Sequence, residues 1–116
     1  MFLKTTAALA LVGSVLAGPM KRQSSCPSIH VFGARETTAG AGFGSSATVV
    51  NGILSANAGA TSEAINYPAC GGQASCGGDS YSQSVQAGFA AAATAVNNFN
   101  SQCPDTQLVL VGYSQV

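Results

Sequence analysis

The sequence contains very little charge: 4 Lys and Arg residues and 4 Asp and Glu residues among 116, with a formal net charge of +0. Proteins that bind nucleic acid through its phosphates need clusters of Lys and Arg, so this class is excluded. Trp is absent, which leaves few side chains for stacking on sugar rings. No apolar run reaches the 18 residues of a membrane span, and no membrane partner is expected. With 47% hydrophobic residues, the chain is suited to one small folded domain rather than a disordered tail.

The first 22 residues resemble targeting and processing signals. Lys4 precedes a small, apolar run of fourteen residues, from Thr5 to Gly18, which is typical of a signal peptide and too short to cross a bilayer. The pair Lys21–Arg22 then forms a dibasic propeptide site. We therefore expect a secreted, extracellular product with three segments: a signal peptide (1–18), a propeptide (19–22) and a mature domain (23–116).

The mature segment contains four cysteines: Cys26, Cys70, Cys76 and Cys103. An even number in an exported chain indicates two disulfides, and three pairings are possible. We favour a local Cys70–Cys76 link together with Cys26–Cys103, which would join the mature N-terminus to the end of the last helix. The spacing of Cys70 and Cys76 does not suit zinc, and the chain has one His, so no metal is expected.

Apolar runs and turn residues predict an alternation of strands and helices. Three short runs are typical of strands, at residues 29–34, 63–67 and 108–111. Ser45 or Ser46 is expected to cap a first helix, and Ser80 a second. In the second helix, apolar residues recur every three or four positions: Val85, Phe89, Ala92, Val96 and Phe99. The order strand, helix, strand, helix, strand is that of an α/β fold with a parallel sheet.

The last strand runs into the clearest chemical motif of the sequence. Residues 108–111 are all apolar, as in a parallel strand buried on both faces. Gly112-Tyr113-Ser114-Gln115 follows and supplies four of the five positions of Gly-x-Ser-x-Gly, the turn that exposes a nucleophilic serine at the edge of a sheet. Val116 stands where the second Gly belongs. An ordinary serine at a strand end is the alternative interpretation.

Three segments resemble fungal acetylxylan esterases of the cutinase-like family of serine esterases. They are Ser-Cys-Pro-Ser-Ile-His-Val-Phe-Gly-Ala-Arg-Glu-Thr-Thr (25–38), Asn-Tyr-Pro-Ala-Cys-Gly-Gly-Gln (66–73) and Val-Gly-Tyr-Ser-Gln (111–115). The resemblance implies a three-layer α/β-hydrolase-like fold, of which this chain holds the N-terminal half with three strands and two helices. It implies a monomeric full-length enzyme without cofactor or metal, acting on acetylated xylan of plant cell walls. Cutin or another short-chain ester is the second choice of substrate, and the family's disulfides agree with the pairing favoured above.

The resemblance also implies the roles of three residues. Ser114 is expected to attack the ester carbonyl and to form an acyl-enzyme. The backbone N–H of Gln115 and the backbone N–H and hydroxyl of Thr37 are expected to form the oxyanion hole. Both loops follow strands of the expected parallel sheet, at the edge where open α/β sheets place their sites.

The general base of such a site has no candidate in this sequence. In the family an Asp and a His follow the serine, and neither follows Ser114 here. His30 is expected to be a packed strand residue, and Asp79 and Asp105 loop or cap residues. We therefore interpret the chain as a fragment with little activity and poor solubility, or as the product of an incomplete gene model. A non-catalytic secreted protein or pseudoenzyme is the alternative.

A second motif suggests dinucleotide binding and is disfavoured. Gly42-Phe43-Gly44-Ser45-Ser46-Ala47 matches Gly-x-Gly-x-x-Gly/Ala before a helix. Its glycines begin several residues after the first strand instead of forming the tight turn at its end. Glu63 falls at the start of the second expected strand, whereas the acidic residue that binds ribose belongs at the end. An exported chain would also be separated from cellular NAD.

Overall fold

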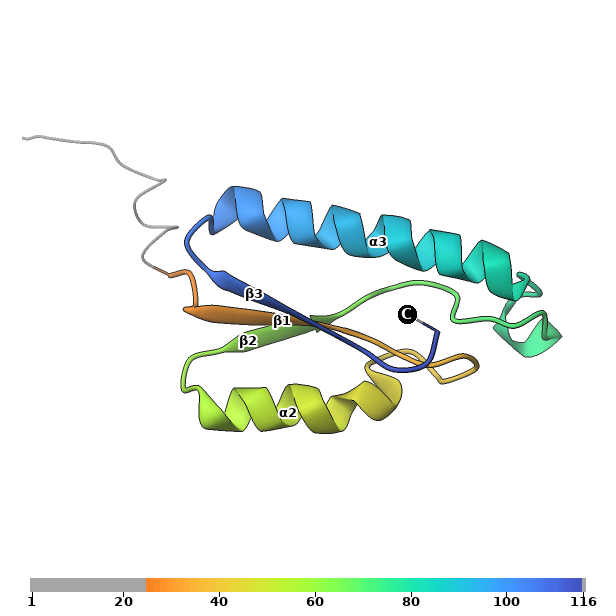
Figure 1. Ribbon diagram of the computed structural model, residues 1–116, viewed down its shortest axis with the longest axis horizontal. Helices are drawn as coiled ribbons and strands as arrows, with labels where there is room; N and C mark the ends of the chain where they lie inside the picture. Colours follow the sequence, from red (N-terminus) through yellow and green to blue (C-terminus); the bar gives the residue numbers. More distant parts are fainter. Residues whose placement is uncertain (1–24, 116) are drawn as a thin grey trace, which may run out of the picture.

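A computed structural model describes residues 25–115, which form a parallel three-stranded sheet between two helices (Figure 1). The signal peptide and propeptide predicted over residues 1–22 lie outside the described residues. The elements in chain order are β1 (Ile29–Ala34), η1 (Gly44–Ser46), α2 (Ala47–Ala56), β2 (Thr61–Ala64), η2 (Ala74–Cys76), α3 (Tyr81–Gln102) and β3 (Gln107–Gly112). The α/β fold, the parallel sheet and the two covering helices are as predicted.

The central strand of the sheet is β1, since the strand order is β2-β1-β3. Its residues from His30 to Ala34 are buried, because a strand lies on each side and a helix on each face. His30 is aligned with Thr61 of β2 and with Leu108 of β3. All three strands therefore point their carboxyl ends to the same edge of the sheet, and the loops after β1 and β3 start there.

The second strand begins earlier than predicted and is also shorter. Its observed range is Thr61–Ala64, not 63–67. The strand begins with polar residues, so a search for apolar runs does not detect its start. Its backbone nevertheless pairs with β1, because this pairing does not depend on the side chains. After Ala64 one further bond, from the N–H of Ile65 to the carbonyl oxygen of Gly33 (2.8 Å), is made before the chain leaves the sheet.

The two helices begin in different ways. Ser80 caps α3 as predicted: its hydroxyl accepts from the N–H of Gln83 (3.1 Å), and the Gln83 side chain accepts from the Ser80 N–H (2.9 Å). Ser46 occupies the N-cap position of α2, one of the two positions predicted, but its side chain makes no capping hydrogen bond. The Ser46 hydroxyl donates to the Phe43 carbonyl (2.6 Å) instead of accepting, and Ser45 is bonded to the carboxylate of Glu36.

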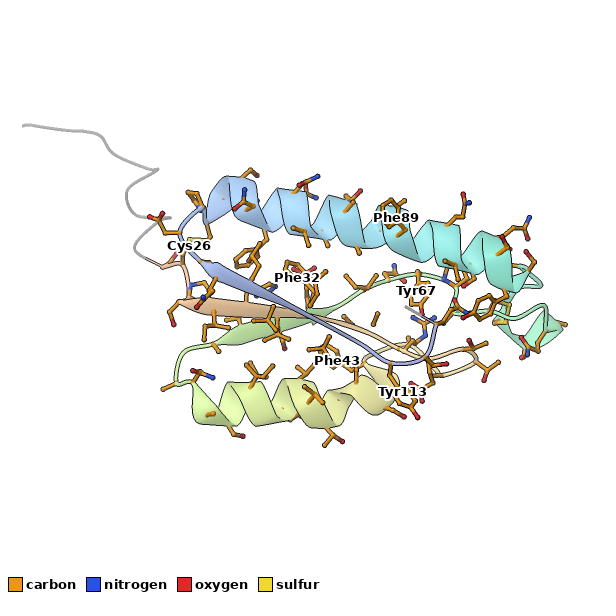
Figure 2. All side chains as sticks on the ribbon, in the orientation of Figure 1. Cys26, Phe32, Phe43, Tyr67, Phe89 and Tyr113 are labelled. Atoms are coloured by element: carbon orange, nitrogen blue, oxygen red, sulfur yellow. A yellow bond between two sulfur atoms is a disulfide. The ribbon has the colours of Figure 1, made fainter. Side chains whose placement is uncertain are left out.

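The core lies between the sheet and α3. It is built by Phe32, Ala34, Ile65, Tyr67 and Ala69, against which the helix packs Ala91, Ala92, Ala95, Val96 and Phe99. Of the predicted apolar stripe of α3, Ala92, Val96 and Phe99 thus pack on this core. Phe89, labelled on α3 in Figure 2, stays 79% exposed.

The third strand is not buried on both faces, although its fully apolar run is typical of a strand that is. Exposure on at least one side is the expectation for the N-terminal half of the fold alone, and it is observed. The strand forms an edge of the sheet in residues 25–115, and Leu110 is 61% exposed. A fully apolar run indicates that both faces of a strand are suited to burial, but burial also requires other elements that pack on those faces. Leu110 and Phe89 line the same apolar groove, so an apolar face beside β3 is left exposed in the described chain.

Both predicted disulfides are present. Cys26–Cys103 ties the segment before β1 to the end of α3, and Cys70–Cys76 closes the loop that contains η2. The four sulfur atoms are therefore paired with one another, and none of these cysteines is a free thiolate that could bind zinc. Within residues 25–115 no group of three or more His, Cys, Asp or Glu side chains is placed to hold a metal ion. None of the helices described there has the length and hydropathy of a membrane span.

Candidate functional site

The candidate site lies at the carboxyl edge of the sheet, where the loops after β1 and β3 meet. Thr37 comes three residues after the end of β1, and Ser114 two residues after the end of β3. Since these strands are hydrogen-bonded neighbours, their loops leave the sheet side by side. The two loops are in direct contact, because the side-chain nitrogen Nε2 of Gln115 lies 2.8 Å from Oγ1 of Thr37.

Ser114 sits in a tight turn with a left-handed backbone. Its φ is +71°, which costs a non-glycine residue about 1–2 kcal/mol. The N–H of Gln115 donates to the carbonyl oxygen of Tyr113 (3.0 Å), so that three residues close the turn around the serine. Ser114 is exposed, whereas Gln115 is 3% exposed. The turn thus presents the serine to solvent and directs the next side chain inward.

The Thr37 loop is held by several backbone bonds. The N–H of Ala39 donates to the carbonyl oxygen of Glu36 (3.1 Å), and Thr38, in this turn, has a φ of +68°. The Thr38 N–H donates to the carbonyl oxygen of Ala69 (2.7 Å), which fixes the turn to the segment after β2. The backbone N–H of Thr37 has no acceptor among residues 25–115. The loop therefore offers a free N–H from a well-supported position.

Arg35 and Tyr67 support the base of the same loop. The Arg35 guanidinium donates to the carbonyl oxygens of Ala39 (2.8 Å) and Pro68 (3.3 Å) and lies 5.4 Å from the centre of the Tyr67 ring. The Tyr67 hydroxyl donates to the Arg35 carbonyl oxygen. Burial raises the pKa of the Tyr67 phenol, which keeps the hydroxyl protonated as a donor. The loop after β1 is thereby fastened to the loop after β2.

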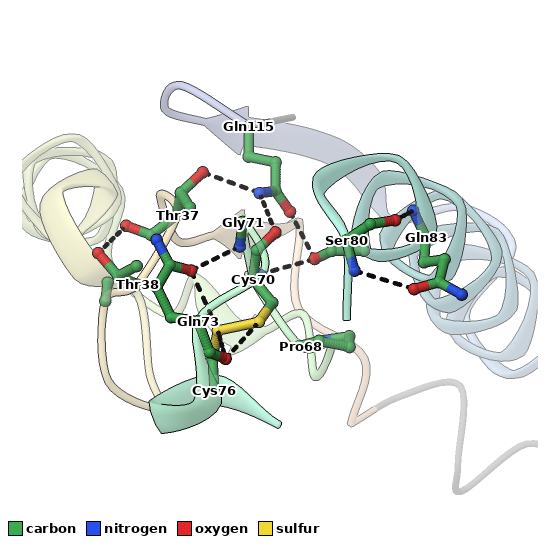
Figure 3. Close-up of a disulfide and its surroundings, with 12 residues drawn as sticks. Thr37, Thr38, Pro68, Cys70, Gly71, Gln73, Cys76, Ser80, Gln83 and Gln115 are labelled. Atoms are coloured by element: carbon green, nitrogen blue, oxygen red, sulfur yellow. Dashed lines mark hydrogen bonds between the residues drawn. A yellow bond between two sulfur atoms is a disulfide. The ribbon is translucent and has the colours of Figure 1, made fainter. Parts of the chain in front are cut away.

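A buried hydrogen-bond network joins the serine turn to the neighbouring loops (Figure 3). The Gln115 side chain donates from Nε2 to Thr37 Oγ1 (2.8 Å) and to the Cys70 carbonyl oxygen (3.1 Å). Its oxygen Oε1 accepts from the hydroxyl of Ser84 (2.6 Å), which in turn accepts from the N–H of Cys70 (2.9 Å). One amide thus links β3, the Thr37 loop, the disulfide loop and α3.

Ser84 was not among the residues singled out from the sequence. It is fully buried in the first turns of α3, and its partners lie 14 and 31 residues away. A serine near a helix N-terminus is common, and nothing in the local pattern distinguishes it from its neighbours. A polar residue adjoining the apolar stripe at Val85 was the one available signal, and it does not identify a partner.

Of the remaining titratable candidates, His30 lies away from the serine, near the opposite end of the sheet. His30 is aligned with Leu108, four residues or about 13 Å from the end of β3 at Gly112. Its ring bonds to Thr61 (2.6 Å) and Glu63 (2.9 Å) and stacks on Phe99, as expected for a packed strand residue. Asp79 and Asp105 lie in loops, also as expected.

The helix N-terminus that a dinucleotide would use is already occupied. The Glu36 carboxylate accepts from the backbone N–H of Ser45 (2.8 Å) and from its hydroxyl (2.6 Å). These bonds, above all the one from the hydroxyl, lower the pKa of Glu36. A pyrophosphate placed here would meet a carboxylate, so the geometry gives the dinucleotide motif no support.

An apolar groove of about 420 Å³ adjoins the network. It runs between α3 and the end of β3, and Gln115 forms part of its wall. Its other walls come mainly from Tyr67, Phe89, Ala92, Val96 and Leu110. The groove and the serine turn therefore share one residue, although the serine itself does not line the groove.

Comparison with known proteins identifies relatives at high identity. The model of the family described as "Cutinase" matches residues 25–116. Acetylxylan esterase 2 of Talaromyces purpureogenus is 72% identical over 100 residues, which are 86% of this chain and 42% of that protein. Cutinase 11 of Verticillium dahliae is 67% identical over 109 residues, which are 94% of this chain and 36% of that protein.

Solved structures share the fold as well. The catalytic core domain of acetyl xylan esterase from Trichoderma reesei superposes with a TM-score of 0.76 at 72% sequence identity. The match covers 78% of this chain and 44% of that one. The chain thus spans less than half the length of these relatives, between 36% and 44%.

Proposed function

We propose, from the premise that the chain belongs to the cutinase family, that Ser114 is the nucleophile of a carboxylic ester hydrolase. The observation that carries the proposal is the turn at Ser114. A serine with a φ of +71°, two residues after a parallel strand, has the strained strand-end geometry that exposes a nucleophile at a sheet edge. The relatives named as esterases support the same reaction class.

The reaction would proceed in two steps through Ser114. The Ser114 oxygen bonds to the ester carbonyl carbon, the bond from that carbon to the alcohol oxygen breaks, and the alcohol leaves with a proton. Water then attacks the acyl-enzyme, releasing the acid and restoring the hydroxyl. No metal or cofactor takes part in this proposal. Negative charge on the carbonyl oxygen in both steps would be stabilised by Thr37 and by the N–H of Gln115.

The two sides of this oxyanion hole differ in readiness. The Thr37 N–H has no acceptor within the described chain, so it is free to donate to a substrate. The Gln115 N–H donates to the Tyr113 carbonyl oxygen (3.0 Å) and must leave it before it can bind an oxyanion. We infer that the first step by this chain is slow, because one donor must be reoriented.

The second feature that slows the reaction is that no described residue is placed to act as the general base for Ser114. The one His of the sequence is held by Thr61 and Glu63 at the far end of β1. We infer that the base and its carboxylate partner are not among residues 25–115, and that the chain acting alone acylates Ser114 with little turnover. A serine hydroxyl without a base is a weak nucleophile.

Acetylated xylan is the substrate that the relatives favour. Two of the curated relatives are named acetylxylan esterases, and a third is named a cutinase. We propose deacetylation of xylan by an extracellular, monomeric enzyme, with cutin or a short-chain ester as the second choice. The signal peptide predicted over residues 1–18 is the basis for secretion.

The substrate can be tested by product analysis. The chain is incubated with acetylated xylan or with cutin, with imidazole added as an external base, and acetate and hydroxy fatty acids are measured. We expect acetate from xylan to exceed fatty acid from cutin and to disappear in Ser114→Ala. Product from cutin alone would favour the cutinase assignment. If Ser114→Ala released as much acetate as the parent, the proposal would be contradicted and a non-catalytic secreted protein would be favoured. The bond from the Gln115 N–H to Tyr113, which occupies an oxyanion donor, is the observation that supports this alternative.

A further inference from the structure

We propose that Ser84 is a positioning residue that keeps the Thr37 hydroxyl available as a hydrogen-bond donor to the substrate oxyanion. The inference rests on the proposed function of Ser114 and Thr37. Ser84 lies on α3, does not hydrogen-bond to Thr37, and acts on it through the side chain of Gln115. The argument depends on which groups of the buried network can donate and which can only accept.

The first link fixes the direction of the Ser84 hydroxyl. The backbone N–H of Cys70 can only donate, and it lies 2.9 Å from the Ser84 oxygen. With its oxygen accepting from Cys70, Ser84 turns its proton to the remaining partner, Oε1 of Gln115, at 2.6 Å. Ser84 is 0% exposed, so water does not offer the hydroxyl another partner.

The second link fixes the Gln115 amide. Oε1 is held by the Ser84 proton, and Nε2 therefore faces the opposite way. There it meets the carbonyl oxygen of Cys70 (3.1 Å), which can only accept, and Oγ1 of Thr37 (2.8 Å). Two groups on opposite sides of the amide, the Ser84 hydroxyl and the Cys70 carbonyl, thus require the same orientation.

The third link leaves the Thr37 proton free. Because Oγ1 accepts a hydrogen from Gln115 Nε2, the Thr37 hydroxyl does not need to donate to that amide. It has no other protein acceptor among residues 25–115. If the amide were reversed, Oε1 would face Thr37 and take its proton, and the oxyanion would lose that donor. Ser84 opposes this reversal from inside the protein, where a hydrogen bond is not screened by water.

The kinetic test is a double-mutant cycle on the full chain. The parent, Ser84→Ala, Thr37→Val and the double variant react with diethyl p-nitrophenyl phosphate, and phosphorylation of Ser114 is followed by mass spectrometry. We expect Ser84→Ala to slow labelling about tenfold in the parent, a part of the 10²–10³-fold effect of losing an oxyanion donor. In the Thr37→Val background the same substitution should change the rate less than about twofold. Equal slowing in both backgrounds would show a purely structural role and overturn the proposal.

Ser82→Ala is the matched control, since Ser82 is exposed on the same helix two residues away. It should label at the parent's rate. A spectroscopic measurement on the parent covers the case in which Ser84→Ala does not fold. Across the hydrogen bond from Gln115 Nε2 to the Cys70 carbonyl oxygen, NMR should detect a scalar coupling between that nitrogen and the Cys70 carbonyl carbon. Absence of that coupling would overturn the proposal. Labelling of the parent no faster than that of other serines would instead refute the proposed function, while the coupling still decides the orientation of the amide.

Discussion

At the scale of single residues, the site depends on polar side chains whose partners are distant in sequence. Thr37 and Gln115 were placed at the sheet edge by the family resemblance, and the structure brings their side chains within 2.8 Å. Ser84 could not be found in this way, because its burial and its two partners exist only once α3 packs beside the loops. The packed role of His30 could be anticipated from its place in a strand, although its bonds to Thr61 and Glu63 could not.

Glu36 leads to a prediction about pH. Hydrogen bonds from Ser45 hold the pKa of Glu36 below the usual 4.5; the bond from the Ser45 hydroxyl has the largest effect, and the bond from its N–H the next largest. An acid with a lowered pKa in the folded state stabilises the fold above its unfolded pKa, and this contribution is lost as the pH falls through the folded value. The loss should therefore begin below about pH 4.5. In Glu36→Gln the melting temperature should fall less between pH 6 and pH 3 than in the parent, as measured by circular dichroism. An unchanged pH dependence would contradict the role given to this carboxylate.

At the scale of elements, prediction succeeded where one residue pattern decided the outcome. β1 was predicted with its observed bounds, because five of its six residues are buried in a continuous run. The cap of α3 was predicted from Ser80 alone, and the structure adds the reciprocal bond from the Gln83 side chain. The bounds of β2 were mispredicted because the backbone of β1 determines them. The N-cap position of α2 was predicted correctly at Ser46, but the expected capping bond is absent, and the carboxylate of Glu36 binds Ser45 at this helix start instead.

The contact between α3 and Tyr67 gives a prediction with an internal control. A Cβ added at Gly88 would lie 2.8 Å from the Tyr67 ring, which is buried and bonded to Arg35. A Cβ added at Gly52 of α2 would have no atom within 4 Å. Alanine is favoured over glycine inside a helix by about 1 kcal/mol, whereas overpacking costs about 1–3 kcal/mol.

In urea unfolding we therefore expect opposite signs for the two substitutions. Gly52→Ala should raise the free energy of unfolding by about 0.5–1 kcal/mol, and Gly88→Ala should lower it by about 1 kcal/mol. Stabilisation by both would show that α3 does not approach Tyr67 as closely as described.

At the scale of the whole molecule, an apolar face is left open. β3 is an edge of the sheet in the described residues, and Leu110 and Phe89 on this face are 61% and 79% exposed. An exposed apolar edge strand favours pairing with other chains. The sequence could predict that residues 108–111 form a strand, and the resemblance could predict its exposure, because the relatives are more than twice as long as the matched segment.

Association through this face can be tested with one charge. Leu110→Lys places an ammonium on the edge strand and should lower the mass-average size of the chain in light scattering at concentrations where the parent self-associates. Val49→Lys is the control, because Val49 is 53% exposed on α2, on the other face of the sheet. An equal effect of both substitutions would indicate that charge alone, rather than the β3 face, governs association.

The central claim is that the turn after β3 makes Ser114 a nucleophile, and selective labelling tests it most directly. The chain is treated with diethyl p-nitrophenyl phosphate, digested and mapped by mass spectrometry, beside Ser114→Ala. The account predicts one diethyl phosphoryl group on the peptide that contains Ser114, added faster than to any other serine, and none at that position in the variant. Labelling spread evenly over the exposed serines, with Ser114 no faster than Ser82, would contradict it.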